Sequence, residues 1–268
     1  MSLRHELAER AHKYAISHQK PFALSYGEMP VVCFPSHADE STHGNFMRES
    51  YRTILANPDW QKRLGKVHTQ ARRSMPSREH GRWRELDSCM SSDALLMNIF
   101  CHPRVSRDGA AFAFLGAEVD ALPCFGYKAR VPLANGRLDR TEVDLRLGNL
   151  LIEAKLTEND FQQAEKSVLL RYRDFHDVFD HDQLPQTEGH YLSYQLLRNV
   201  LAANALHCSF RVLLDERRPD LIEAWYSVMR CVKPAELRTT LGVLTWQELA
   251  RVLPPKVRIF LSSKYGIA

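Results

Sequence analysis

Hydrophobic residues recur at helical spacing in some parts of the chain and form short runs in others. Near the start, Leu3, Leu7 and Ala11 lie four positions apart and predict an amphipathic helix that Ser2 can cap. Equivalent patterns, with proline and capping residues at their ends, predict helices over 3–19, 46–56, 59–74, 85–100, 160–179, 188–207 and 219–232. Short apolar runs predict strands at 30–34, 124–131, 208–214 and 241–244.

The stretch 141–156 has a different pattern, in which two β-rich runs flank Gly148 and Asn149. A two-residue loop with glycine first predicts a hairpin with a type II′ turn. The turn fixes which residues are opposite one another, and alternate residues of a strand share a face. The apolar pairs expected on one face are Leu147–Leu150, Leu145–Ile152 and Val143–Ala154.

The opposite face of this hairpin carries charged residues. In the expected register Asp144 lies opposite Glu153, with Cβ atoms about 5 Å apart, where like charges repel unless a cation lies between them. Carboxylate oxygens suit a hard ion, Mg²⁺ or Mn²⁺, rather than zinc. Lys155 is two residues past Glu153 and projects from the same face. The alternative is a surface hairpin whose charged face is simply solvated.

Asp144, an interval of eight residues and then Glu153-Ala154-Lys155 resemble the active-site signature of the PD-(D/E)XK nuclease superfamily. Val143 stands where that signature usually has proline, a departure that touches turn geometry more than chemistry. The resemblance implies that Asp144, Glu153 and the backbone carbonyl of Ala154 bind Mg²⁺ (or Mn²⁺). It also implies that Lys155 is catalytic and either positions or deprotonates the attacking water or stabilises developing negative charge.

Two helical segments carry further resemblances to predicted bacterial restriction-type endonucleases of the same superfamily. The first is 91–100, where Asp93 replaces a glutamine of the family motif and is expected to be a third metal ligand. The second is 194–199, Tyr-Gln-Leu-Leu-Arg-Asn, which resembles the helix after the catalytic strands. There Gln195 and Arg198 are expected to hold a phosphate or the attacking water, and a polar seam between helices is the alternative.

These resemblances imply an α/β fold of the restriction-endonuclease-like type, an αβββαβ core with a mixed sheet flanked by helices. The order of expected elements from residue 85 to residue 214 agrees with that core. We therefore expect a nuclease-like domain over 85–268 and a mainly helical, basic region over 1–84.

The segment from residue 52 to residue 84 is rich in arginine and lysine, with aromatic residues among them. This combination suits phosphate contact and base stacking, although a solvated helix face followed by a flexible arginine-rich loop would look the same. The nucleic-acid contacts expected are Lys62, Arg63, Arg72 and Arg73, together with Arg198 from the later helix.

The amino-acid composition sets broad limits on the class of protein and its partners. The chain has 268 residues, 44% hydrophobic and 25% charged, with a net charge of +4, which is ordinary for a globular protein and permits a polyanionic partner. No apolar run is long enough for a membrane span, and the charged N-terminus does not resemble a signal peptide. The six cysteines form no C-x-x-C pair, so reduced thiols and a cytoplasmic location are expected.

The implied function is metal-dependent hydrolysis of DNA phosphodiester bonds by a restriction-like endonuclease. DNA is the expected partner, no membrane partner is expected, and a homodimer is compatible with this function. Three alternatives remain open. They are a catalytically silent DNA-binding protein on the same fold, an RNA nuclease or exonuclease, and a regulatory protein whose hairpin is merely charged.

Overall fold

The computed structural model describes residues 2–25, 30–35, 41–67 and 83–268, and these divide into two compact units. The first unit contains Met1–Phe114 and Trp246–Ala268, and the second contains Leu115–Thr245. The boundary expected after residue 84 therefore falls inside the first unit. The C-terminal segment returns to that unit because its last helix packs against the first helix of the chain.

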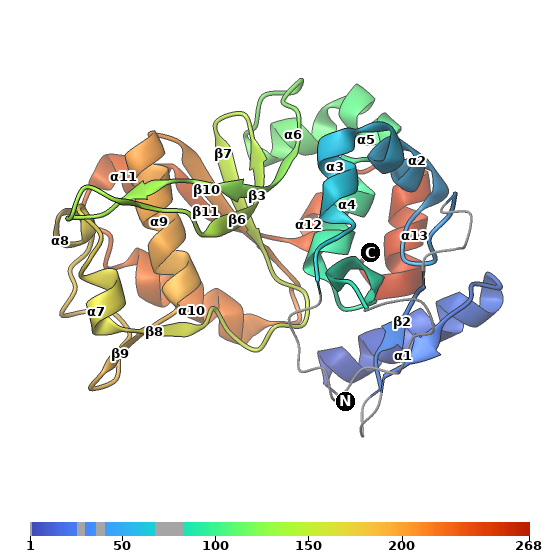
Figure 1. Cartoon of the computed structure of the whole chain (residues 1–268), viewed down its shortest axis with the longest axis horizontal. Helices are drawn as coiled ribbons and strands as arrows, with labels where there is room; N and C mark the ends of the chain where they lie inside the picture. The colour runs from blue at the N-terminus through green and yellow to red at the C-terminus, as the bar shows by residue number, and fades with distance from the viewer. Residues whose placement is uncertain (1, 26–29, 36–40, 68–82) are drawn as a thin grey trace. The chain divides into compact units, whose positions relative to one another are not determined.

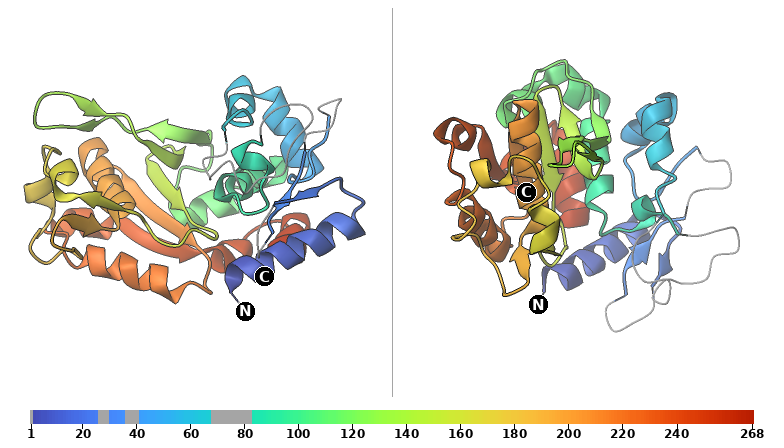
Figure 2. Two further views of the ribbon diagram at one scale, coloured as in Figure 1. Left: turned by 60° about the horizontal axis from the view of Figure 1, so that its bottom comes forward. Right: turned by 60° about the vertical axis from the view of Figure 1, so that its left-hand side comes forward.

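The first unit is mainly helical. Its elements are α1 (Leu3–Ser17), β1 (Ala23–Leu24), β2 (Val32–Cys33), α2 (Arg48–Ala56), α3 (Pro58–Arg63), the 3-10 helix η1 (Glu85–Asp87), α4 (Ser92–Phe100), α5 (Pro103–Asp108), α6 (Ala110–Leu115), α12 (Trp246–Ala250) and α13 (Pro255–Tyr265). Leu7, Ala11 and Tyr14 form the buried side of α1, as their spacing predicted, and α1 lies beside α13 (Figure 2). No helix among the residues described is long and apolar enough to cross a membrane.

The second unit is built on a five-stranded mixed sheet (Figure 1). Its elements are β3 (Cys124–Lys128), β4 (Val131–Pro132), β5 (Leu138–Asp139), β6 (Glu142–Leu147), β7 (Leu150–Ala154), β8 (Gln163–Glu165), α7 (Lys166–Leu169), α8 (Phe175–Val178), β9 (His190–Leu192), α9 (Tyr194–Leu206), β10 (Ser209–Leu214), α10 (Pro219–Met229), α11 (Ala235–Thr239) and β11 (Leu241–Thr245). The strand order is β11-β10-β7-β6-β3. Strand β10 runs parallel to β11 and β7, whereas β6 runs antiparallel to β7 and β3.

Helix α9 packs on β7 and β10, and α10 packs on α9 (Figures 1 and 2). The core between helix and sheet contains Leu197 and Val200 from α9, Leu151 from β7, and Phe210 and Val212 from β10. The expected α/β fold with a mixed sheet flanked by helices is confirmed.

Several of the expected helices were wrong in part. The helix predicted over 85–100 begins only at Ser92, where the Ser91 hydroxyl accepts the Ala94 N–H at 3.1 Å. The residues before it are drawn into pairing with β2, because the Cys89 N–H donates to the Val32 carbonyl at 2.9 Å. These long-range bonds outweigh the helical periodicity of the segment.

The helix predicted over 160–179 is replaced by β8 and the short helices α7 and α8. Gln162 has a φ of +60°, a left-handed conformation that no regular helix contains, and its N–H is taken by the Asp160 carboxylate at 2.7 Å. Ser193 has a φ of +58°, so the helix predicted from residue 188 begins at Tyr194. Helix α3 ends at Arg63, and residues 68–74 of its expected range lie outside the described residues.

Candidate active site on the central hairpin

Strands β6 and β7 form the predicted hairpin. Gly148 has a φ of +53° while Asn149 has no positive φ, which is the pattern of a type II′ turn. The register includes Leu147 opposite Leu150 and Leu145 opposite Ile152, as expected. Past Ile152 the arrangement changes, because the Asp144 carboxylate accepts the Ala154 N–H at 2.8 Å. Asp144 is thereby fixed against the end of β7, beside the residues that follow.

Glu153 lies in the middle strand of the sheet and is 1% exposed. Its carboxylate is held on both sides: Oε1 accepts from the Lys155 Nζ at 3.0 Å, and Oε2 accepts from the Asn199 Nδ2 at 2.8 Å. A buried carboxylate needs such partners, since an unpaired charge away from water is costly. The interpretation of this hairpin as a solvated charged face is therefore wrong for β7.

Lys155 is 4% exposed and is fixed at both ends. Its backbone N–H donates to the Leu213 carbonyl at 2.8 Å, and its Nζ donates to the Gln195 Oε1 at 2.8 Å as well as to Glu153. Burial lowers the pKa of Lys155, but the nearby carboxylates of Glu153, Glu158 and Asp144 outweigh it, so the pKa is raised. The amine is held as an ammonium cation.

Helix α9 supplies the side chains that cover this pair. Gln195 and Asn199 are four residues apart, one turn of the helix, so both face β7. Gln195 contacts Lys155 while Asn199 contacts Glu153. The structure thus brings together Glu153, Lys155 and Gln195, which were predicted from sequence, and adds Asn199, which was not.

Arg198 was expected to contact nucleic acid, but its side chain lies inside the unit. It is 4% exposed, and its Nε and NH2 groups donate to the Asn199 Oδ1 at 3.0 and 2.8 Å. The guanidinium is also 3.9 Å from the Glu153 Oε2. Arg198 therefore orients the Asn199 amide so that its NH₂ group points at Glu153. Its contact with nucleic acid stays a prediction.

Glu158 is a second residue that the sequence reasoning missed. Its Oε2 accepts the backbone N–H groups of Leu156 and Thr157 at 2.7 and 2.9 Å, which holds the turn after β7. Its charge is among those that raise the pKa of Lys155. Its position in the sequence could have indicated this role, because Glu158 lies three residues past Lys155, where the chain turns away from the sheet.

The remaining predicted site residues belong to the first unit or to undescribed parts of the chain. Asp93 lies in the first turn of α4, and its Oδ2 accepts from Arg63 and Lys66, both at 2.8 Å. Lys62 pairs with Asp59 on the exposed side of α3. Roles in metal or nucleic-acid binding stay predictions for these residues, and Arg72 and Arg73 lie outside the described residues.

The donors at the hairpin suit a magnesium-type ion. Asp144, Glu153 and the Ala154 carbonyl offer only oxygen, which hard divalent cations prefer. Within the described ranges no group of three or more His, Cys, Asp and Glu side chains is placed to hold a metal. The protein donors that the hairpin could offer to such an ion are therefore two carboxylates and a backbone carbonyl.

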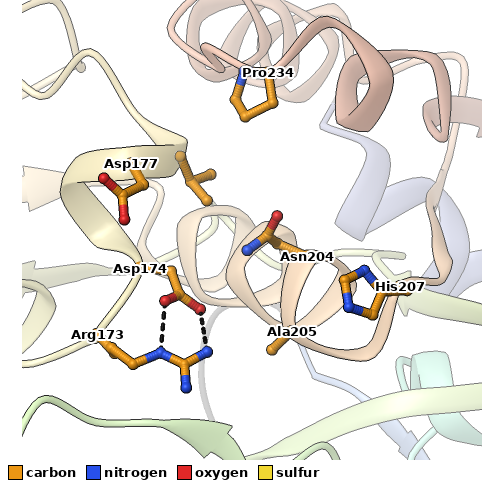
Figure 3. Close-up of a pocket in the computed structure, with 8 residues that line it drawn as sticks. Arg173, Asp174, Asp177, Asn204, Ala205, His207 and Pro234 are labelled. Carbon is orange, nitrogen blue, oxygen red and sulfur yellow. Dashed lines mark hydrogen bonds and ion pairs between the residues drawn. The ribbon is translucent and has the colours of Figure 1, made fainter.

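A separate pocket in the same unit, with a volume of about 250 Å³, lies between α8, the end of α9 and Pro234 (Figure 3). Arg173 and Asp174 at its edge form a two-pronged ion pair at 2.7 and 2.9 Å. Asp177, Asn204 and His207 also line it. None of the predicted catalytic side chains reaches this pocket.

The mixed α/β fold and the acidic and basic residues of the hairpin are compatible with a restriction-endonuclease-like protein. A family model described as restriction endonuclease associating with ARP (REase-ARP) matches residues 8–266, and the chain belongs to this family. The match extends across both units. Neither a curated protein nor a solved structure matches the chain.

Proposed function

We propose that this protein is a metal-dependent nuclease of the PD-(D/E)XK type that hydrolyses DNA phosphodiester bonds as a restriction-like endonuclease. The observation that carries this proposal is the buried chain of contacts from Asn199 through Glu153 and Lys155 to Gln195, with Asp144 fixed on the neighbouring strand. Membership of a restriction-endonuclease family supports DNA as the substrate.

In this proposal Asp144, Glu153 and the Ala154 carbonyl hold the metal ion, for which Mg²⁺ is the natural choice and Mn²⁺ an effective substitute. When bound, the ion lowers the pKa of a coordinated water and offsets charge on the phosphate. Lys155 contributes a fixed ammonium group beside the reacting phosphate, where it stabilises the negative charge that develops. The Gln195 side-chain oxygen holds the Lys155 ammonium in place. The same side chain also orients the attacking water.

The test is cleavage of supercoiled plasmid, linear duplex and single-stranded DNA with Mg²⁺, Mn²⁺ or EDTA. The variants are Asp144→Asn, Glu153→Gln and Lys155→Met, which remove charge with little change in side-chain size. Each is expected to lose cleavage by about a hundredfold or more. Lys233→Ala is the matched control, because Lys233 is exposed in the same unit and its ammonium donates to the His176 carbonyl, away from the hairpin. Circular dichroism establishes that each variant is folded.

The product pattern separates the finer alternatives. Conversion of the closed plasmid to open or linear forms would support an endonuclease, whereas degradation only of linear ends would indicate an exonuclease. Salt-sensitive binding of DNA without any metal-dependent cutting would replace the proposal with a binding protein on the nuclease fold. Cutting that survives in all three variants would show that the assigned site is wrong.

A further inference from the structure

The loop that follows β7 forms one wall around Lys155. It runs from Leu156 to Gln162, and Phe161 within it is 1% exposed and places its ring centroid 5.6 Å from the Lys155 Nζ. The Phe161 carbonyl accepts the Gln195 N–H at 3.0 Å, which ties the end of the loop to the start of α9. The loop therefore contacts two members of the hairpin site, Lys155 and Gln195.

No helix or strand of the described chain includes this loop. Bonds from side chains to the backbone give it its shape. The Leu156 and Thr157 N–H groups donate to the Glu158 carboxylate at 2.7 and 2.9 Å, and the Gln162 N–H donates to Asp160 at 2.7 Å. Segments without a regular hydrogen-bond ladder open more readily than strands or helices. The position of the loop beside Lys155 therefore depends on contacts from other parts of the unit.

A turn after β10 brings Arg218 to this loop. Strands β7 and β10 are parallel neighbours, so the loops that follow them leave the same edge of the sheet. The Arg218 N–H donates to the Asp215 carbonyl at 2.9 Å, which closes the turn, and the Asp215 carboxylate accepts the Arg217 N–H at 3.0 Å. Pro219 begins α10 and restricts the backbone of the residue before it. The sequence Asp-Glu-Arg-Arg-Pro therefore fixes Arg218 at the start of α10.

The Arg218 guanidinium holds the loop by its backbone. Its NH1 group donates to the Glu158 carbonyl at 2.6 Å, and its NH2 group donates to the Asn159 carbonyl at 2.8 Å. The Asp220 carboxylate accepts from Nε and NH2 at 2.9 and 2.7 Å, which orients the guanidinium plane. The Arg218 side chain is 15% exposed, so protein covers most of it. The planar fork of an arginine can make this set of bonds, whereas the single ammonium of a lysine cannot.

We propose that Arg218 is a positioning residue for the nuclease reaction, because by fixing the loop after β7 it keeps Lys155 in the place where its ammonium acts. That place lies between Glu153 and Gln195. The inference rests on the function proposed above and adds a residue from another segment of the chain to its machinery. An arginine that served only the start of α10 could pair with Asp220 alone. It would not need two carbonyls that lie 60 and 59 positions earlier in the chain.

Loss of the Arg218 contacts is expected to act on the rate of cleavage rather than on the binding of DNA. A loop that moves lets the Lys155 ammonium shift relative to the phosphate, and a displacement of about 1 Å can cost about a hundredfold in rate. Because Lys155 acts on charge that develops during the reaction, its misplacement lowers kcat and leaves KM nearly unchanged.

The test measures kcat and KM for plasmid cleavage by the full chain with Mg²⁺. Arg218→Met removes the donors and keeps the aliphatic stem, so kcat should fall about ten- to a hundredfold while KM changes less than about twofold. Arg218→Lys restores the charge and one donor group, so part of the loss should be recovered. Arg173→Met is the matched control, because Arg173 is an exposed arginine of the same unit that makes a two-pronged ion pair with Asp174. It changes the net charge equally and should leave kcat unchanged.

A second measurement reports on Lys155 without any cleavage. Its ammonium is buried and donates to Glu153 and Gln195, so its protons exchange slowly with water and give a ¹⁵N NMR signal. The absence of this signal in Lys155→Met assigns it. In Arg218→Met the protons should exchange about tenfold faster or more, whereas Arg173→Met should leave their exchange unchanged. Thermal unfolding shows whether each variant is folded, and Arg218→Lys takes the place of Arg218→Met in both measurements if the latter is not.

A lower kcat with faster exchange at Lys155 would support the proposal. An unchanged kcat in Arg218→Met would overturn it while leaving the nuclease proposal intact. A lower kcat with unchanged exchange at Lys155 would overturn it as well, because Arg218 would then act by another route. If the wild type cleaves no substrate, the nuclease proposal is refuted, and the exchange measurement alone decides whether Arg218 positions Lys155.

Discussion

The most quantitative prediction concerns Lys264, a lysine of α13 with 0% exposure in the first unit. Its ammonium donates to the Asn45 carbonyl at 2.8 Å and to the Asn45 side-chain oxygen. Among the described residues, this ammonium contacts these two oxygens and four aromatic rings. The rings have centroids between 5.0 and 5.7 Å from Nζ and belong to Tyr14, Phe34, Phe260 and Tyr265.

Burial lowers the pKa of Lys264 from 10.5 to about 7, a change that the nearby Cys89 opposes and Lys20 reinforces. Because the folded pKa is below the unfolded one, the unfolded chain binds more protons between these two pH values. Stability must therefore rise with pH in that window. For this pair of pKa values the rise between pH 7 and pH 8.5 is roughly 1.5 kcal/mol. Above about pH 9 the buried Cys89, whose pKa is raised to about 11, acts in the opposite direction.

The assay is urea unfolding at pH 7.0, 7.75 and 8.5, followed by tryptophan fluorescence. Trp60, Trp83 and Trp246, three of the four tryptophans, belong to the first unit, so the signal reports mainly on the unit that contains Lys264. Lys264→Met removes the titrating group and retains most of its volume. Lys256→Met, at an exposed lysine of the same helix, is the matched control.

The informative quantity is the difference in unfolding free energy between wild type and Lys264→Met at each pH. It should shift by roughly 1.5 kcal/mol in favour of the wild type from pH 7.0 to pH 8.5, while the Lys256→Met difference stays constant. A Lys264→Met difference that is flat within about 0.3 kcal/mol would refute the reasoning, because it would mean that the buried amine keeps an ordinary pKa.

Two further changes test the packing and the hairpin site. Asn199→Ala removes the amide that holds Glu153 and should raise the Mg²⁺ concentration for half-maximal cleavage by about ten- to a hundredfold, whereas Asn204→Ala on the same helix should leave it unchanged. An unchanged Mg²⁺ requirement in Asn199→Ala would mean that the amide does not position Glu153. Gly44→Ala would place a Cβ 2.4 Å from the Phe34 Cδ1 and should lower the unfolding free energy by about 1–3 kcal/mol in the same urea assay. A loss below about 0.5 kcal/mol would show that Phe34 can move aside.

The hairpin could be predicted from sequence because its geometry is determined locally. A glycine at the first turn position and alternation along two adjacent strands fix both register and faces, so Asp144 and Glu153 were placed correctly on neighbouring strands, with Lys155 directly after the second strand. Strand β10 could also be predicted from the sequence, since its apolar run is short, continuous and followed by a charged turn.

The segments that were predicted wrongly are those in which distant residues decide the conformation. Residues 85–91 have helical periodicity, but their backbone groups bond to β2, more than fifty positions away in the chain. Residues 163–165 pair with β9, a partner that lies beyond two short helices. Periodicity describes what a segment would do by itself, and it carries no information about such partners.

Arg198 shows the same limit for a single side chain. An arginine on a predicted helix after the two strands of the hairpin is equally compatible with a phosphate contact and with a seam between elements. The position of α9 over β7, which the sequence does not show, leaves Arg198 4% exposed and bonded to Asn199. The sequence did contain a clue, since Gln195 and Asn199 are four positions apart and must share a helix face.

The burial of Glu153 and Lys155 is itself an argument for chemistry at the hairpin. Ion pairs removed from water often contribute nothing to stability, and apolar side chains of similar volume would fit such a site at least as well. Here the pair lies at the end of a central strand next to an apolar core. The side-chain amides of Gln195 and Asn199 on α9 hydrogen-bond to it. A fold that needed only packing would not require this arrangement. Buried charged residues are expected where a protein carries out its function. The buried pair of Glu153 and Lys155 consists of residues that carry the nuclease resemblance.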